Sequence, residues 1–306
     1  MNIPKNHHFV PESYLQFFSF NEIGDLFTHK PKFKYPNGVR KFNKSAICYS
    51  IDLYKLDKQL NDDEYLIEKE KFHYEKSFIK NIITKVNKFE SLNDNEYFEI
   101  VKMILNIKNR NITLYNQFHS FSSENIDAIL KDISGKLNDN LKNSSFIENI
   151  CKIAKDEALK NLNDKNKSKM ILNESFLKIL NSENDKFNYL ESFITSKKYK
   201  IFYSDDTNSF ITSDNPGHTI HKNGIVGNLN FGSAEAFFFP LSPKCAIFID
   251  VKDAILGGDM KSSTTNYEFL NPEFVNMFNK GTVQNCDQII ISNSKQVLSK
   301  YIKKMP

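Results

Sequence analysis

Residues 236–251 read Ala-Phe-Phe-Phe-Pro-Leu-Ser-Pro-Lys-Cys-Ala-Ile-Phe-Ile-Asp-Val, and this stretch decides the fold class. It contains two short runs of β-forming residues, at 236–241 and 245–251. Comparable runs occur at 199–203, 209–212 and 288–292. The last third of the chain therefore predicts a mainly antiparallel sheet.

The middle of the chain, from about Tyr65 to Tyr189, has a helical period instead. Its apolar residues recur at intervals of three and four, as in the stripe from Phe78 to Phe89. Further stripes lie at 100–107, 126–137, 147–154 and 171–180. We expect a helical bundle here, interrupted at 155–169 by a solvated helix end or loop.

The first 55 residues have a mixed pattern. Pro11 suits the first turn of a short aromatic helix that ends at Phe18, because proline has no N–H to leave unpaired there. Extended runs at 25–29 and 49–54 predict strands, and Asn37-Gly38 predicts a tight turn. These strands complete an α+β fold in which the bundle packs with the sheet.

We expect a single domain over 1–306, made of a mixed segment (1–60), a helical region (65–197) and a sheet-rich region (198–306). Within the last region, four glycines between Gly217 and Gly232 predict a mobile loop that acts as a lid. A helix is expected at Phe274–Asn279.

Composition excludes several classes of protein. The formal net charge of +4 is too small to indicate nucleic-acid binding by itself, and the four cysteines form no Cys-x-x-Cys pair. No apolar run follows Met1, and no segment reaches the ~20 apolar residues of a membrane-spanning helix. We expect a cytoplasmic protein with reduced thiols and no membrane partner.

Three motifs distinguish the chain. The first comprises His7, His8, Pro11, Tyr14, Leu15 and Phe18; the second is Thr212-Ser213-Asp214-Asn215-Pro216; the third is Phe239-Pro240-Leu241-Ser242-Pro243. In this order they resemble the domain-of-unknown-function 4238 family over nearly the whole chain. The resemblance implies a bacterial protein and supplies no established activity.

The polar residues of these motifs suggest a site. A histidine pair on a turn presents imidazoles that bind metals or move protons near neutral pH, and a divalent metal also takes carboxylates. The resemblance brings forward Glu68, Glu75 and Asp214 as those carboxylates. The site predicted from them has three sets of residues: catalytic His7, His8, Glu75, Asp214 and Asn215; metal-binding His8, Glu75 and Asp214; and substrate-binding Arg110.

A structural interpretation competes with this one. His8 would cap the following helix, Glu75 would pair with a lysine or with Arg110, and Asp214-Asn215-Pro216 would be an Asx turn at the end of a strand. A Walker loop, a Gly-x-Ser-x-Gly elbow, a dinucleotide fingerprint and a His-Glu-x-x-His motif are all missing from the sequence.

Two functions follow from these interpretations. One is a metal-assisted phosphodiester hydrolase, a nuclease-like effector of phage defence or toxin activity with nucleic acid as its partner. The alternative is a non-catalytic binding or regulatory protein, with a protein partner, whose His, Asp and Glu cluster is structural.

Overall fold

The chain's contacts separate it into two units. The computed structural model describes residues 6–32, 38–59, 61–71, 75–113, 115–116, 145–181, 192–228, 231–253, 255–256 and 265–302. A larger unit consists of Asn6–Ile51, Phe72–Asn111 and Glu183–Pro306, and a smaller unit consists mainly of Asp52–Lys71 and Ile112–Ser182. The three motifs all lie in the larger unit.

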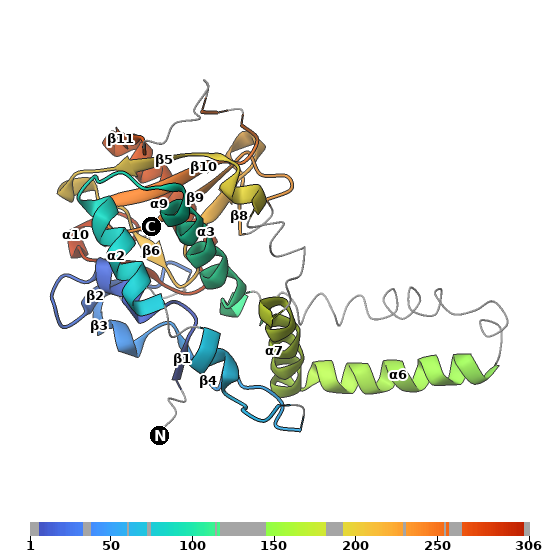
Figure 1. The fold of residues 1–306 in the computed structure, drawn as a ribbon. Coiled ribbons are helices and arrows are strands. Elements are labelled where there is room, and N and C mark those ends of the chain that lie inside the picture. Colours follow the sequence, from blue (N-terminus) through green and yellow to red (C-terminus); the bar gives the residue numbers. More distant parts are fainter. Residues whose placement is uncertain are drawn as a thin grey trace. The chain divides into compact units, whose positions relative to one another are not determined.

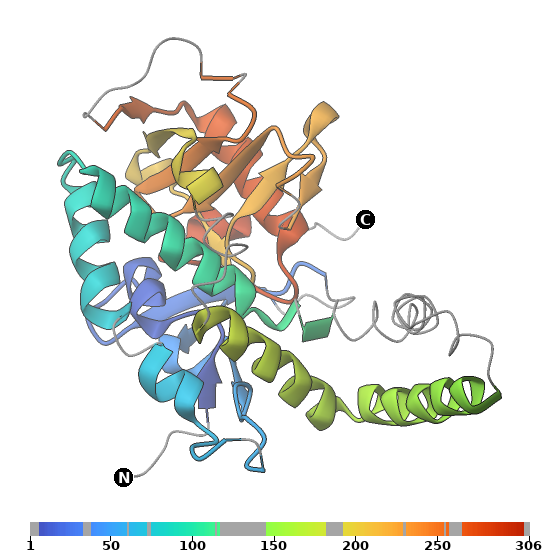
Figure 2. The ribbon, with the colours of Figure 1, turned by 45° about the vertical axis from the view of Figure 1, so that its right-hand side comes forward.

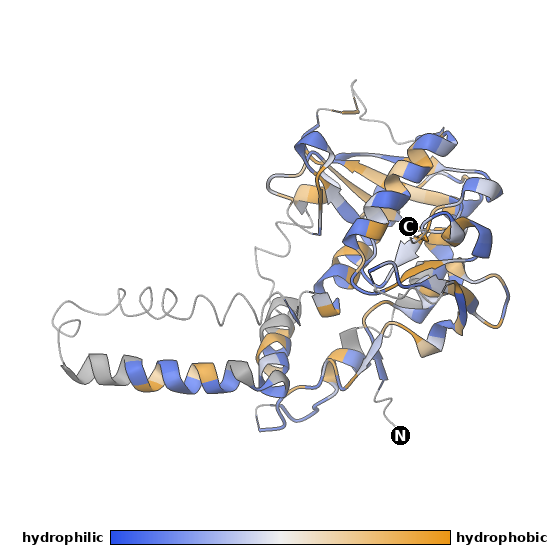
Figure 3. Cartoon of the chain, turned by 180° about the vertical axis from the view of Figure 1, so that it is seen from behind, coloured by the Kyte–Doolittle hydropathy of each residue, from blue (hydrophilic) through white to orange (hydrophobic). Residues whose placement is uncertain are grey.

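A six-stranded sheet forms the core of the larger unit, in the order β11-β5-β10-β9-β7-β8 (Figure 1). Its strands are β5 (Lys198–Tyr203), β7 (His218–Ile220), β8 (Val226–Gly227), β9 (Ala236–Pro240), β10 (Cys245–Asp250) and β11 (Tyr267–Phe269). Every pair is antiparallel except β11 with β5. All residues of β9 and β10 are buried, which explains why their sequences are apolar up to Asp250. Figure 3 shows hydrophobic residues gathered along these strands.

A second sheet combines both ends of the chain. Its order is β3-β2-β12-β6, all antiparallel, with β2 (Asp25–His29), β3 (Arg40–Asn43), β6 (Thr212–Ser213) and β12 (Ile290–Ser292). A separate pair joins β1 (Asn6–His8) to β4 (Tyr49–Ile51). The α+β class is thus confirmed, whereas the expected single sheet is divided among three.

The strand expected at 209–212 begins late, at Thr212. The side chain of Asn279 explains the difference, because its Oδ1 accepts the Ile211 N–H at 3.0 Å and its Nδ2 donates to Ser209 O at 3.1 Å. The Asn279 amide therefore bonds the backbone groups that a neighbouring strand would otherwise pair.

The expected lid is largely ordered structure in the described residues. β7 and β8 form a hairpin with a 3₁₀ turn, Lys222–Gly224, between them. Gly217 has φ +72°, and a Cβ there would lie 2.5 Å from Phe239 Cδ2. Close packing requires glycine at position 217, and the expected mobility of the loop stays a prediction.

Helices are present in both units. The larger unit holds α1 (Glu12–Leu15) with a 3₁₀ turn at Gln16–Phe18, α2 (Glu75–Asn87), α3 (Asp94–Asn109), α9 (Pro272–Asn285) and α10 (Lys295–Ser299). The smaller unit holds a π-helical turn (Ile67–Lys71), α6 (Ser145–Asn163) and α7 (Lys165–Asn181). The expected single bundle is not confirmed, because α2 and α3 belong to one unit and α6 and α7 to the other. The stripe at 126–137 and Asn37 lie outside the described residues.

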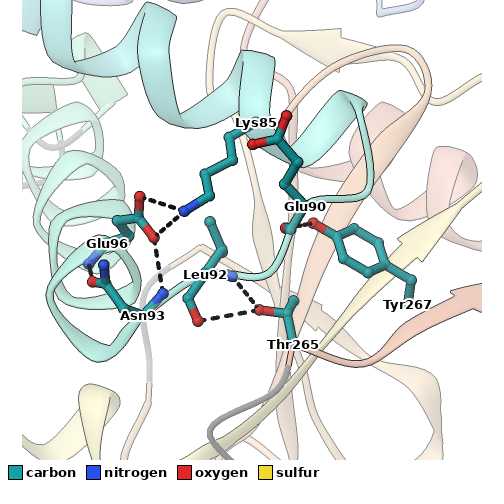
Figure 4. Close-up of polar contacts among 7 residues, drawn as sticks. All are labelled: Lys85, Glu90, Leu92, Asn93, Glu96, Thr265 and Tyr267. Carbon is teal, nitrogen blue, oxygen red and sulfur yellow. Dashed lines mark hydrogen bonds and ion pairs between the residues drawn. The ribbon is translucent and has the colours of Figure 1, made fainter.

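A tight corner between α2 and α3 sets the direction of α3, as the upper left of Figure 2 shows. Asn93 caps α3 by accepting the Glu96 N–H at 2.9 Å, and Glu96 returns a bond to the Asn93 N–H at 2.8 Å. The same carboxylate pairs with Lys85 of α2 at 2.8 Å (Figure 4). Thr265 and Tyr267 hold the chain between the helices, at Leu92 N and Glu90 O. The capping bonds and this corner thereby fix where the C-terminal end of α3 lies.

In the smaller unit, α7 holds the segment that follows β4. Asn173 donates to the carbonyls of Leu53 and Lys55, each at 2.9 Å, and accepts from the Tyr115 hydroxyl at 2.5 Å. Across the described residues of both units, every helix is too short or too polar to cross a membrane.

Candidate functional site

The histidine pair lies on β1, next to β4. His7 is fully buried, and its register partner is Ser50. The His8 ring lies 3.6 Å from Glu12 Oε1 and hydrogen-bonds the backbone of Ser45. Burial lowers the pKa of His8; Glu12 opposes that shift and Arg110 adds to it. α1 has no side-chain cap, so His8 faces Glu12 instead of capping the helix.

Tyr14 brings the three sequence motifs into contact. Its ring is buried, and its hydroxyl donates to Pro240 O at 2.6 Å. The hydroxyl also lies 2.8 Å from Thr212 Oγ1, which then acts as the donor because the phenol has one proton. Burial raises the pKa of Tyr14 far above its usual range. The three sequence motifs therefore meet at one hydroxyl group.

Asp214 follows β6 and binds the chain that leads into β12. Its carboxylate accepts the backbone N–H groups of Asp287 at 2.9 Å, Gln288 at 2.6 Å and Ile289 at 3.1 Å. The Asp214 carboxylate therefore does not form the expected Asx turn. Ser213 Oγ accepts the Asn215 N–H at 3.1 Å, so the local turn bond comes from serine. Burial raises the pKa of Asp214 to about 6, although the three N–H donors lower it.

Lys108, on the last turn of α3, lies against the residues after Asp214. Its Nζ donates to Asn215 Oδ1 at 2.7 Å, Gly217 O at 2.8 Å and Asn228 Oδ1 at 2.5 Å. Lys108 is fully buried, and burial holds the pKa of its ammonium well below the usual range. Among the described residues no carboxylate pairs with Lys108, so its charge is balanced by carbonyl dipoles alone.

Two asparagines complete the hydrogen-bond network. Asn285, at the end of α9, donates to Asn215 O at 3.1 Å and Gly217 O at 2.8 Å, and Asn215 Nδ2 returns a bond to Asn285 O at 3.1 Å. Asn111 donates to Asp214 O at 2.6 Å. We name the side chains of Lys108, Asn111, Asp214, Asn215 and Asn285 the polar junction.

His218 lies beside the polar junction, in β7. The ring is buried against Phe238, with centroids 5.3 Å apart, and a Cβ on Gly281 of α9 would lie 2.4 Å from its Nε2. Burial, with a contribution from Lys108, lowers the pKa of His218 to about 3. The imidazole is therefore neutral at physiological pH. Its Nδ1 has no hydrogen-bond partner among the described residues.

The structure unites some of the predicted site residues and leaves others apart. Asp214 and Asn215 lie in the polar junction, and Arg110, which is 2% exposed, follows α3 within electrostatic range of His8. The side chain of Glu75 lies outside the described residues, so its pairing with Arg110 stays a prediction. Glu68 is in the π-helical turn of the smaller unit, whereas Glu75 begins α2.

Sequence reasoning missed Lys108 and Asn285, and it weighed His218 only as a loop histidine that could join a site. The signal for Lys108 was present, because it continues the buried stripe of Val101 and Ile104 at helical spacing. A lysine on a buried stripe indicates a specific polar partner. The described residues include no group of three or more His, Cys, Asp or Glu side chains arranged to hold a metal ion.

Comparison with known protein families gives a match over nearly the whole chain. Residues 6–296 match the model of a family described as "Protein of unknown function (DUF4238)". Searches of the curated proteins and of the solved structures find no match.

Proposed function

The chain belongs to the DUF4238 family of unknown function, and from that premise we propose that it is a non-catalytic binding or regulatory protein. In this proposal the polar junction is structural. It fastens α3 and the end of α9 to the segment that links the two larger sheets.

The proposal rests on the hydrogen bonds that the Asp214 carboxylate accepts. Three backbone N–H groups at 2.6–3.1 Å already occupy its two oxygens. They take up three of the roughly four positions at which a carboxylate accepts hydrogen bonds, and each buried N–H that a metal ion or a substrate displaced would cost about 1–3 kcal/mol. A carboxylate with these partners suits the fastening of a loop better than the binding of a ligand.

Asn215 supports the same conclusion. Its Oδ1 accepts from Lys108 and its Nδ2 donates to Asn285, so both polar atoms of the side chain have structural partners. The ammonium group 2.7 Å from Oδ1 would also repel a divalent cation at that oxygen. Two of the five predicted catalytic residues are therefore already engaged within the fold.

One observation favours a second candidate, the metal-assisted phosphodiester hydrolase of phage defence or toxin activity. Arg110 lies within electrostatic range of His8. An arginine beside an imidazole is a combination that holds a phosphate and moves a proton. In that function His8, Glu75 and Asp214 would hold the metal, and nucleic acid would be the substrate.

A degradation assay separates the two candidates. Wild type, His8→Ala and His221→Ala would be incubated with plasmid DNA and single-stranded RNA in the presence of Mg²⁺ or Mn²⁺. His221 lies in the β7–β8 hairpin, away from the histidine pair, and its variant controls for the loss of a histidine. We expect no degradation by any of the three proteins.

Metal-dependent degradation by wild type that disappears in folded His8→Ala, but persists in His221→Ala, would contradict the proposal. It would establish the hydrolase instead. Circular dichroism would verify that each variant is folded.

A further inference from the structure

A pocket of about 400 Å³ opens between α9, α10 and the 3₁₀ turn at Asp206–Asn208. Its volume falls within the usual range for sites that hold small molecules, roughly 300–1,000 Å³. The lining residues are Asn208, Ser209, Pro272, Val275, Asn276, Asn279, Lys280, Val297, Lys300 and Tyr301. None of them belongs to the polar junction.

The lining is positively charged. Lys280 and Lys300 contribute two ammonium groups, and none of the described residues that line the pocket is Asp or Glu. Lys300 Nζ contacts only neutral oxygens, Thr207 O and Asn208 Oδ1, each at 3.2 Å. The nearby Asp205 carboxylate accepts the N–H groups of Thr207 and Asn208. Within the part of the chain that the structure describes, no carboxylate pairs with either lysine.

A neutral hydrogen-bond donor, the Ser209 hydroxyl, supplements the two lysines. The hydroxyl of Ser209 is buried and has no hydrogen-bond partner among the described residues. A buried hydroxyl without a partner costs about 1–3 kcal/mol, so a ligand that accepted a hydrogen bond from it would recover that cost. The remaining polar wall is held in place, because Tyr301 donates to Asn276 Oδ1 at 3.2 Å and Asn279 binds Ser209 O.

The rest of the wall is apolar. Val275 and Val297 are buried, and Pro272 lies at the start of α9. A ligand that fits this lining carries an anionic head and a small apolar body. Two lysines match a phosphate monoester, which carries a charge of about −1.5 to −2 near neutral pH, better than a carboxylate, which carries one.

We propose that this pocket binds a small organic phosphate, with the phosphate held by Lys280, Lys300 and Ser209 and the organic group against the two valines. The site lies outside the polar junction, so this inference and the proposed function can fail independently.

Calorimetric titration tests the inference. Phenyl phosphate is the probe, with benzoate, benzyl alcohol and inorganic phosphate for comparison, on wild type and on the Lys280→Gln/Lys300→Gln double variant. Lys295→Gln removes an exposed lysine of α10 that does not line the pocket and is the matched control. We expect phenyl phosphate to bind wild type and Lys295→Gln alike, about tenfold more weakly to the double variant, and more weakly as salt rises.

The order of the probes is part of the test. Phenyl phosphate should bind more tightly than inorganic phosphate, and benzyl alcohol should not bind. Absence of phenyl phosphate binding at millimolar concentration would overturn the inference, as would equal affinity for the double variant. Benzoate binding as tightly as phenyl phosphate would overturn the assignment of the ligand as a phosphate.

Discussion

At the scale of single residues, several buried polar side chains of the larger unit join segments that are distant in the sequence. Tyr14 and Thr212 are 198 positions apart, and Asp214 binds backbone groups 73 to 75 positions away. Such contacts close long loops at an entropic cost that grows slowly with loop length. A few of them can therefore determine how the termini pack.

Asp214 gives a prediction about pH. Because its folded pKa of about 6 lies above the ordinary value of 3.8, the protonated form favours folding. This contribution is fully present below pH 3.8 and is lost as pH rises through 6. The free energy of unfolding of wild type, relative to Asp214→Asn, should be larger at pH 4 than at pH 7.5 by up to about 3 kcal/mol.

Urea unfolding at both pH values measures this difference. Asp206→Asn removes an exposed carboxylate and controls for the change in net charge. A difference that grows as pH rises would mean that the three N–H donors outweigh burial and hold the folded pKa below 3.8.

At the scale of elements, the turn between β6 and β7 depends on Gly217. Gly217→Ala should strongly destabilise the protein, by about 2–4 kcal/mol, because the new methyl group would clash with Phe239 in a strained backbone conformation. Gly224 has nearly the same φ, +73°, with nothing within 4 Å of an added Cβ. Gly224→Ala should therefore cost about 1 kcal/mol, the strain alone. Equal shifts in the midpoint of thermal unfolding would show that packing against Phe239 is unimportant.

Elements encoded by local patterns were predictable from the sequence. The opening helix follows from Pro11 and the apolar spacing behind it. Tyr14, Leu15 and Phe18 are fully buried, whereas Phe17 is half-buried. The strands at 236–240 and 245–250 and the helix beginning at Pro272 were expected within a few residues. Short-range backbone preferences and side-chain periodicity decide these elements.

The division of the strands between sheets was not predictable, because it depends on contacts between remote residues. The Asn279 side chain delays the start of β6, and nothing in the sequence near Ser209 indicates it. Only part of the candidate site was predictable from the sequence. Asp214 and Asn215 were identified as polar residues at a strand end, but their partners lie on α3 and at the end of α9.

At the scale of the whole larger unit, the polar junction and Tyr14 together involve all three of its chain segments. Tyr14 comes from the first segment, Lys108 and Asn111 from the second, and Asp214 and Asn285 from the third. A structural junction of this kind should make the segments unfold cooperatively. A catalytic site built on the same residues would not require the three segments to unfold cooperatively.

Hydrogen exchange of the Asp214→Ala variant tests this claim most directly. In wild type, the amides of Asp287, Gln288 and Ile289 should be protected, because the Asp214 carboxylate accepts all three. In the variant they should exchange faster, whereas Asp206→Ala should match wild type. Unprotected amides at 287–289 in wild type, or protection there that survives the loss of the carboxylate, would contradict the structural role of the polar junction.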